Sequence, residues 1–204
     1  MKVIIHQSIC GEVNKAWGLI KTTLPDVNIA KSIAFRTDLQ DQTSGINWNP
    51  AIRGFSEGDY FLIMKTFEDT ALDVRRGRKY SHVLMIPKEE ITRIDNIKQI
   101  ISLLPQEINK NTLLEPISIE ISSNDTVSIP NAIRGKFNKL INGYININSY
   151  KNTLIWIGQE GFDTAVIELW KRLTATERQT FQFGIAFNND HKETNLISLI
   201  AVPE

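Results

Sequence analysis

The chain has 204 residues, and Lys plus Arg equal Asp plus Glu at 23 each, so its formal net charge is zero. This balance excludes a global electrostatic attraction to nucleic acid or to an anionic membrane, and any anion site must be local. A hydrophobic content of 42% is enough for one large core or for two small fused lobes. The lone Cys10 excludes an intramolecular disulfide. The N-terminus also lacks the ~7–15 apolar residues of a signal-peptide core, so we expect a cytoplasmic protein with no membrane contact.

The first half of the chain predicts a strand, a helix and a β-hairpin. A short apolar run leads into His6-Gln7 and indicates a strand, and Asp26 can cap a helix that continues to Ala34. Residues 59–67 and 80–86 are rich in β-branched and aromatic side chains, and the polar connection between them carries several arginines. Because proline cannot donate to a strand ladder, Pro87 is a natural end for the return strand of this hairpin.

The middle of the chain predicts two helices around a short strand. Asp95 can cap a helix that stops at the break before Pro105, and residues 116–121 alternate apolar and polar side chains as a half-buried strand does. A third helix is expected to begin near Pro130, a good first-turn residue. Its apolar face would carry Ile133, Phe137, Leu140, Ile141 and Tyr144.

The C-terminal part predicts a strand, a helix and a second hairpin. Residues 154–157 read as a short buried strand. They are followed by one apolar helical stripe, made of Phe162, Val166, Leu169, Trp170 and Leu173. Residues 181–187 and 196–202 are then expected to pair as a hairpin that ends at Pro203.

These elements predict an α+β fold, with mainly antiparallel strands and three to four helices. Each hairpin follows a helical stretch, which raises the hypothesis of two similar helix-plus-hairpin halves. The polar segments 39–58 and 145–153 read as linkers, but neither is long enough to require a domain boundary. We expect one domain over residues 1–204, with lobes 1–90 and 91–204, that leads a longer protein.

Local catalytic motifs are missing from this sequence. The Gly135-Lys136 pair lacks the upstream glycine and the following Ser or Thr of a phosphate-binding loop, and no HExxH, GxSxG, EF-hand or GxGxxG pattern occurs. These failures favour a non-enzymatic role, with no cofactor and no metal, and leave an enzyme as the alternative.

A basic cluster lies between the strands of the first hairpin. Arg75, Arg76, Arg78 and Lys79 place four cations within five residues, and Gly77 allows a sharp bend among them. Guanidinium groups bind phosphate or carboxylate through two parallel hydrogen bonds, so Arg76 and Arg78 could grip an acidic partner or a nucleotide. The alternative is a solvated loop whose charge is partly neutralised by nearby acidic residues.

Two histidines and a carboxylate form a second candidate group. If His6, His82 and Asp38 converged, with Gln7 beside them, they could serve as an acid/base site, a metal site or a ligand pocket. The alternative is that each histidine is a hydrogen-bonded structural residue beside its strand. We expect His6-Gln7, Asp38 and the segment from Arg76 to His82 to gather at one end of the first hairpin.

An ordered set of motifs resembles the N-terminal domain of bacterial GTPase-associated proteins. It consists of His6-Gln7, Gly11, Trp17-Gly18-Leu19-Ile20, Thr37-Asp38-Leu39, Gly58-Asp59-Tyr60 and Arg76-Gly77-Arg78-Lys79-Tyr80-Ser81-His82-Val83-Leu84. Near the end of the chain, Leu169-Trp170, Leu173, Arg178 and the segment from Phe181 to Phe183 are similar to the end of the same domain.

The resemblance implies an adaptor role in a bacterial conflict or antiphage defence system built around a GTPase or another NTPase. Protein partners, namely the NTPase and an effector, are then expected, and nucleic acid is not. The alternative function is a sensor or enzyme that binds a phosphorylated small molecule through an Arg/His/Asp pocket. A third hypothesis is a homo-oligomer that pairs through the exposed edge of the C-terminal hairpin.

Overall fold

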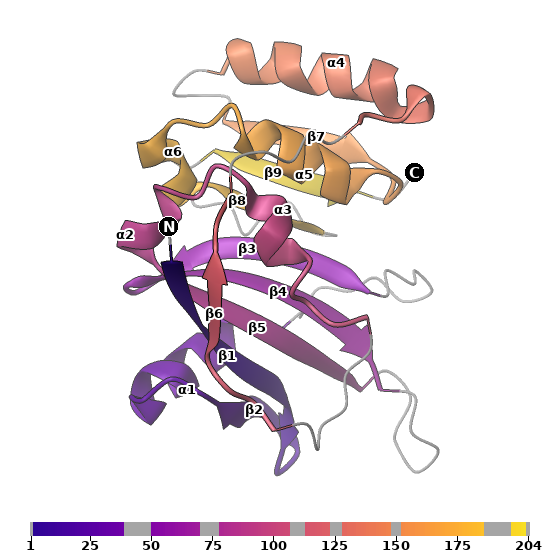
Figure 1. Ribbon diagram of the computed structural model, residues 1–204. Coiled ribbons are helices and arrows are strands. Elements are labelled where there is room, and N and C mark those ends of the chain that lie inside the picture. Colours follow the sequence, from indigo (N-terminus) through magenta and orange to yellow (C-terminus); the bar gives the residue numbers. More distant parts are fainter. Residues whose placement is uncertain are drawn as a thin grey trace.

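The computed structural model describes residues 2–38, 50–69, 78–106, 113–122, 128–147, 152–185 and 197–202. These residues form an α+β fold around one mixed, mostly antiparallel sheet, which confirms the predicted fold class (Figure 1). Eight strands follow the order β2-β1-β5-β4-β3-β8-β9-β7, and β6 pairs with β1 off this path. The strands are β1 (Lys2–Val13), β2 (Ala16–Thr22), β3 (Ala51–Glu57), β4 (Tyr60–Glu68), β5 (Lys79–Pro87), β6 (Ile117–Glu120), β7 (Thr153–Ile157), β8 (Gln182–Ile185) and β9 (Ser198–Val202).

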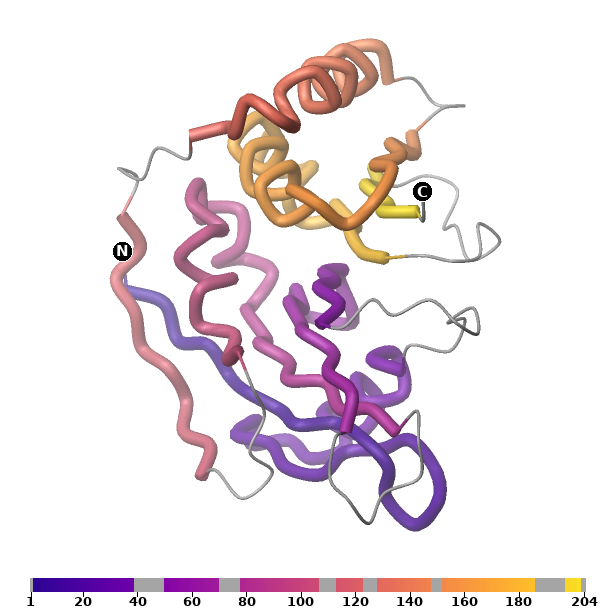
Figure 2. Tube along the Cα trace, turned by 90° about the vertical axis from the view of Figure 1, so that its right-hand side faces the viewer, coloured from indigo at the N-terminus to yellow at the C-terminus, as the bar shows by residue number. Residues whose placement is uncertain are grey.

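The long strand β1 has different partners along its length. Its first residues pair with β6 from Lys2 to Ile5, whereas residues from His6 to Gly11 pair with β5. On its other side β1 pairs with β2 through a two-residue turn at Asn14 and Lys15, both of which have positive φ. Figure 2 shows β6 running beside the indigo β1.

The first predicted hairpin is confirmed. β4 and β5 pair antiparallel in continuous register from Tyr60 opposite Pro87 to Glu68 opposite Lys79. The predicted linker over residues 39–58 is wrong in part, because Ala51–Glu57 forms β3 against β4. The polar composition of this segment hid a strand that is held by its neighbours, not by its own propensity.

The second predicted hairpin is wrong. β8 and β9 are neighbours, but they run parallel, with Gln182 opposite Ser198 and Ile185 opposite Ala201. β9 also pairs in parallel with β7, so neither edge of β9 is free, and the sheet ends at β7 instead. The hypothesis of two similar helix-plus-hairpin halves is therefore wrong. Apolar composition identifies strands, but it carries no information about their relative direction.

Three helices of the described segments have nine or more residues: α1 (Val27–Arg36), α4 (Asn131–Ile145) and α5 (Phe162–Trp170). As predicted, Asp26 caps α1 by accepting from Asn28 N and Ile29 N, and α4 begins directly after Pro130. Three shorter helices, α2 (Lys88–Ile91), α3 (Ile97–Ile101) and α6 (Ala175–Thr180), bring the described set to six, so the predicted number of three to four is only roughly right. No helix in these segments is long and apolar enough to cross a membrane.

Helix α3 differs from its prediction in its cap. Asn96, not Asp95, occupies the N-cap position. The Asp95 carboxylate instead forms an ion pair with Arg178, whose side chain is only 9% exposed. Arg178 also donates to Thr92 O, so α6 is tied to the segment between α2 and α3.

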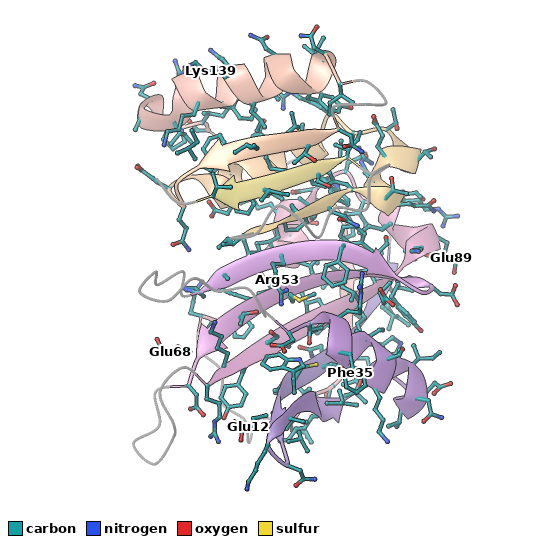
Figure 3. The ribbon with its side chains drawn as sticks, turned by 180° about the vertical axis from the view of Figure 1, so that it is seen from behind. Glu12, Phe35, Arg53, Glu68, Glu89 and Lys139 are labelled. Carbon is teal, nitrogen blue, oxygen red and sulfur yellow. The ribbon has the colours of Figure 1, made fainter. Side chains whose placement is uncertain are left out.

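Two apolar clusters pack against opposite faces of the sheet. The smaller one lies between the sheet and α1, around Ile33, Met64 and Met85. The larger one joins the sheet to α3, α4 and α5 and includes side chains from both halves of the chain. Figure 1 shows α3 and α5 in front of the sheet, whereas Figure 3, seen from behind, shows α1 on the other face.

Aromatic rings connect the two halves within the larger cluster. The Trp170 ring on α5 packs edge-on against Phe61 of β4 at 5.4 Å and against Phe181 at 6.1 Å between centroids. Trp170 Nε1 also donates to Ile94 O at 2.7 Å. The ring of this side chain therefore packs against β4, and its polar atom bonds the segment between α2 and α3.

The strand contact between the halves is narrow. β3 and β8 share one facing pair, Gly54 opposite Phe183. A Cβ at Gly54 would lie 2.3 Å from Cε1 of the Phe183 ring, and a Cβ at Gly184 would lie 2.8 Å from Cγ of Arg53. Glycine at these positions lets β3 and β8 approach closely enough to continue the sheet.

Candidate functional site

The described base of the β4–β5 connection is a compact polar network. Arg78 Nε and the Tyr80 hydroxyl both donate to Asp69 Oδ2 at 2.6 Å, and Arg78 Nη2 donates to the Tyr80 hydroxyl at 3.1 Å. Gly11 of β1 lies against Tyr80, because a Cβ there would be 2.5 Å from Cδ1 of the ring. The motif residues Gly11, Arg78 and Tyr80 thus form one packed unit. Arg76 lies outside the described residues.

Gln7 and His82 form a buried hydrogen-bonded pair. Gln7 is 8% exposed and His82 is 7% exposed. Gln7 Nε2 donates to Glu115 O at 2.6 Å, so Gln7 Oε1 is the acceptor for His82 Nε2 at 2.8 Å. Burial lowers the pKa of His82 to about 4, so the imidazole is neutral near pH 7. This pair fastens the segment before β6 to the centre of the sheet.

His6 lies on the opposite face of the sheet from His82. His6 is opposite Met85, which belongs to the cluster under α1, whereas Gln7 and His82 share the face of the larger cluster. His6 Nδ1 lies 3.2 Å from Thr23 O. The two histidines therefore do not line a common pocket, and the geometry gives no support to an acid/base or metal site made from both.

Thr37 and Asp38 follow the C-terminal end of α1. The Thr37 hydroxyl and the Trp17 indole both donate to Ala34 O, at 2.7 and 2.9 Å. The Arg53 guanidinium donates to the backbone carbonyls of Thr37 and Asp38. The carbonyl oxygens that a helix leaves without partners at this end are thus satisfied by side chains from β2 and β3.

Burial shapes the titration of the groups near this helix end. Desolvation lowers the pKa of Arg53 to about 10, against the opposing attraction of Asp38. Burial also raises the pKa of Cys10 to about 11, so its thiol is protonated near neutral pH and is a poor nucleophile. Thr37, Arg53 and Cys10 belong to the packing of α1 on the sheet.

The predicted site residues therefore separate into groups. Arg78 lies at the tip end of the first hairpin, and Asp38 acts electrostatically on Lys79 at the same end. His82 lies further inside β5, and His6 lies further still, at the level of Met85. Within the described segments, no three His, Cys, Asp or Glu side chains lie together as a metal site requires.

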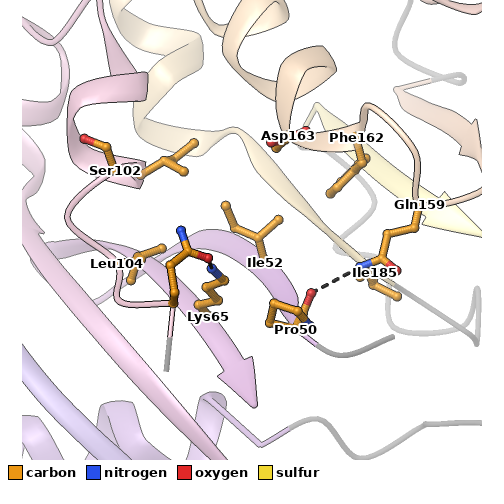
Figure 4. Close-up of a pocket in the computed structure, with 11 residues that line it drawn as sticks. Pro50, Ile52, Lys65, Ser102, Leu104, Gln159, Phe162, Asp163 and Ile185 are labelled. Carbon is orange, nitrogen blue, oxygen red and sulfur yellow. Dashed lines mark hydrogen bonds between the residues drawn. The ribbon is translucent and has the colours of Figure 1, made fainter. Parts of the chain in front are cut away.

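Sequence reasoning missed a pocket at the junction of the two halves. Its volume is about 380 Å³, within the range of small-molecule sites. Apolar lining comes from Ile52, Ile101, Leu104, Phe162 and Ile185, and polar lining includes Lys65, Gln106, Gln159 and Asp163. Figure 4 shows the hydrogen bond from Gln159 Nε2 to Pro50 O that closes one side of the pocket, at 3.1 Å. The one available signal was Lys65, a cation inside the apolar run of β4.

Lys65 and Asp163 are the charged groups of this pocket. Lys65 Nζ donates to Gln106 Oε1 at 3.2 Å and lies 5.5 Å from the centre of the Phe67 ring. Desolvation lowers the pKa of Lys65, and the attraction of Asp163 partly opposes this shift. Asp163 lies in the first turn of α5, where a negative charge is favoured by the helix dipole.

Residues 4–104 match the family model described as GTPase-associated protein 1, N-terminal domain type 1. This part of the chain belongs to that family. The match runs from β1 to the turn after α3 and confirms the resemblance for the motifs from His6 to Leu84. The similar segments from Leu169 to Phe183 lie beyond the matched residues and stay a prediction. No curated protein and no solved structure matches the chain.

Proposed function

We propose that this chain is a protein-interaction adaptor in a bacterial defence system built around a GTPase. The observation that carries the proposal is the membership of residues 4–104 in the GTPase-associated protein 1 family. The internal bonding of the motif residues supports it: Gln7, His82 and Thr37 are buried and hydrogen-bonded to other parts of the chain. Such residues maintain a scaffold, and the contact with a partner then falls to the surface.

The tip end of the first hairpin is the proposed partner surface. Arg76 and Arg78 supply the cations, and the Arg78 side chain is 27% exposed. The β1–β2 turn lies at the same end, because Gly11 is opposite Tyr80 and the strand continues past it to Val13. A charged hairpin tip beside a second turn suits an acidic surface on the GTPase, since arginine is favoured at interface hot spots.

The test is co-purification with the products of neighbouring genes, with any GTPase among them loaded with GDP or with a non-hydrolysable GTP analogue. We expect a complex whose dissociation constant rises about thirtyfold in R76A/R78A, the loss of a hot spot worth about 2 kcal/mol. Arg134→Ala on the exposed face of α4 is the matched control and should leave binding unchanged.

A second control tests whether GTPase binding depends on the charges of the hairpin tip or on its internal hydrogen bonds. Tyr80→Phe removes the hydroxyl that bonds Asp69 and Arg78 but keeps the charges of the tip. It should bind the GTPase as the wild type does. A protein that remains a solitary monomer with the neighbouring gene products in either nucleotide state would overturn the adaptor proposal.

The alternative, a pocket of Arg, His and Asp side chains for a phosphorylated ligand, has less support. His6 and His82 lie on opposite faces of the sheet, so the two histidines do not line the same pocket.

A further inference from the structure

We propose that the pocket between the two halves binds a small zwitterion with an apolar side chain, of the chemistry of a hydrophobic α-amino acid. The proposal does not rest on the adaptor function. Its basis is a cavity with an apolar floor and two opposite charges on different walls.

The floor of the pocket selects for an apolar group. Ile52 of β3 and Ile185 of β8 come from the sheet, Phe162 comes from α5, and Leu104 follows α3. Burial of an aliphatic or aromatic side chain against this floor contributes about 25 cal/mol per Å² of apolar surface removed from water. The specificity must then come from the few polar groups around the floor.

The two charges are arranged for a ligand that carries both signs. Lys65 stands on the strand side and Asp163 on the helix side of the pocket (Figure 4). Among the described residues Lys65 Nζ donates only to Gln106, so two of its three hydrogens are available to a carboxylate. Asp163 Oδ1 accepts from Thr164 N at 2.8 Å, and within the same part of the chain Oδ2 has no hydrogen-bond partner, so it can accept from an ammonium group.

The same charges argue against a phosphate ligand. A phosphate dianion needs more than one cation or a set of backbone donors, whereas Lys65 is the only cation among the described lining residues and Asp163 would repel the dianion. A simple carboxylic acid would leave Asp163 unpaired, and a simple amine would leave Lys65 unpaired. A zwitterion pairs both, and the partial burial that lowers the pKa of Lys65 strengthens the pair between its ammonium and the ligand carboxylate.

The walls of the pocket come from different parts of the chain. Ile52, Lys65 and Leu104 lie inside the segment that matches the family, whereas Gln159, Phe162 and Asp163 lie beyond it. A bound zwitterion would contact both parts at once and would stabilise their junction. Ligand binding should therefore raise the unfolding temperature as well as give a binding isotherm.

The test uses the wild-type full chain with L-leucine, L-isoleucine and L-phenylalanine, by calorimetry and thermal unfolding. We expect saturable binding of at least one of them and a higher melting temperature. 4-Methylpentanoate, which is leucine without its ammonium, and isopentylamine, which is leucine without its carboxylate, should each bind about tenfold more weakly, and glycine should as well. Failure of all three amino acids to bind at about 10 mM, or equal binding of the analogues, would overturn the proposal.

Two variants then test the roles of Lys65 and Asp163 in ligand binding. Lys65→Met keeps the aliphatic stem and Asp163→Asn keeps the shape, and each should weaken amino-acid binding about tenfold. Lys139→Met on exposed α4 and Asp59→Asn at the β3–β4 turn are the matched controls, expected to bind as the wild type does. Unchanged binding in Lys65→Met or Asp163→Asn would contradict the proposed roles of these two side chains. If a variant does not fold, the comparison of leucine with its two analogues still tests the proposal on the wild-type protein.

Discussion

Several polar motif residues of this chain act through buried hydrogen bonds. His82 and Gln7 illustrate the pattern, because the pair is buried in the sheet and anchors the backbone before β6. The motif is therefore explained by structural requirements before any reaction is invoked. Since burial lowers the pKa of His82 to about 4, this residue also makes folding depend on pH.

We predict that His82 destabilises the protein at mildly acidic pH. An unfolded histidine has a pKa near 6.5, so the unfolded state binds the proton first, and stability falls as pH drops from about 6.5 toward 4. The wild type should lose about 2 kcal/mol of unfolding free energy between pH 7 and pH 5 through this residue. Urea denaturation at both pH values measures the loss.

The comparison for this prediction is His82→Gln, whose amide can keep the hydrogen bond to Gln7 and cannot titrate. The variant should lose less stability than the wild type between pH 7 and pH 5. An equal loss in both proteins would show that other groups cause the pH dependence.

Strand alternation could have separated His6 from Gln7 in advance, since neighbouring residues of a strand point to opposite faces. The partnership of Gln7 with His82 could not have been found in this way. It depends on the register between β1 and β5, which the sequence of either strand does not contain. The pocket of Lys65 and Asp163 could not have been predicted from the sequence for a related reason, because its lining residues come from five separate stretches of the chain.

At the scale of elements, the sequence predicted the features that depend on contacts between residues close together in the chain. The Asp26 cap, the start of α4 after Pro130 and the β4–β5 hairpin are set by contacts between near neighbours in sequence, and each was predicted. The parallel direction of β8 and β9 was not, because it depends on the route of the chain between them. Strand β3 was missed because its neighbours β4 and β8 hold it in the sheet.

Helix α1 is predicted to depend on Arg53. Arg53→Met keeps the aliphatic stem beside Gly184 but removes the donors to the carbonyls of Thr37 and Asp38. Buried carbonyls left without partners should lower the unfolding free energy by about 2 kcal/mol. Chemical denaturation measures this loss, and hydrogen exchange should show the amides of α1 losing protection before those of β4.

Arg36→Met is the control for that prediction. Arg36 belongs to α1 as well, but its ion pair with Glu57 is exposed, at 54% and 31% of the two side chains. Removing an exposed pair should change stability by no more than about 1 kcal/mol. If the two variants had equal effects, the anchoring role of Arg53 would be wrong.

At the scale of the whole molecule, the family segment and the rest of the chain share one core. Phe61, Leu84 and Ile97 belong to the segment over residues 4–104, and they pack in the same cluster as Trp170 and Phe181. β6 adds a second dependence, because it pairs with the first residues of β1 from outside that segment.

We therefore predict that a fragment over residues 1–104 does not fold on its own. It would expose the apolar face that α5 covers and would leave the start of β1 without a neighbour on the β6 side. Circular dichroism of the fragment should show no cooperative thermal transition, whereas the full chain should show one. A fragment that unfolds cooperatively at the midpoint of the full chain would contradict this prediction.

The single facing pair between Gly54 and Phe183 also bears on the mechanics of the molecule. Most neighbouring strands of the sheet are joined by ladders of several residues, so they resist being slid or bent apart, but this joint has almost no ladder of its own. Side chains near the joint add contacts instead, namely the Trp170 ring against Phe61, the Arg178 ion pair with Asp95 and the residues that line the pocket. A force that pulls the two ends of the sheet apart would thus separate β3 from β8 first. A few side-chain substitutions at this joint could change how easily the two strands separate, without unfolding any strand.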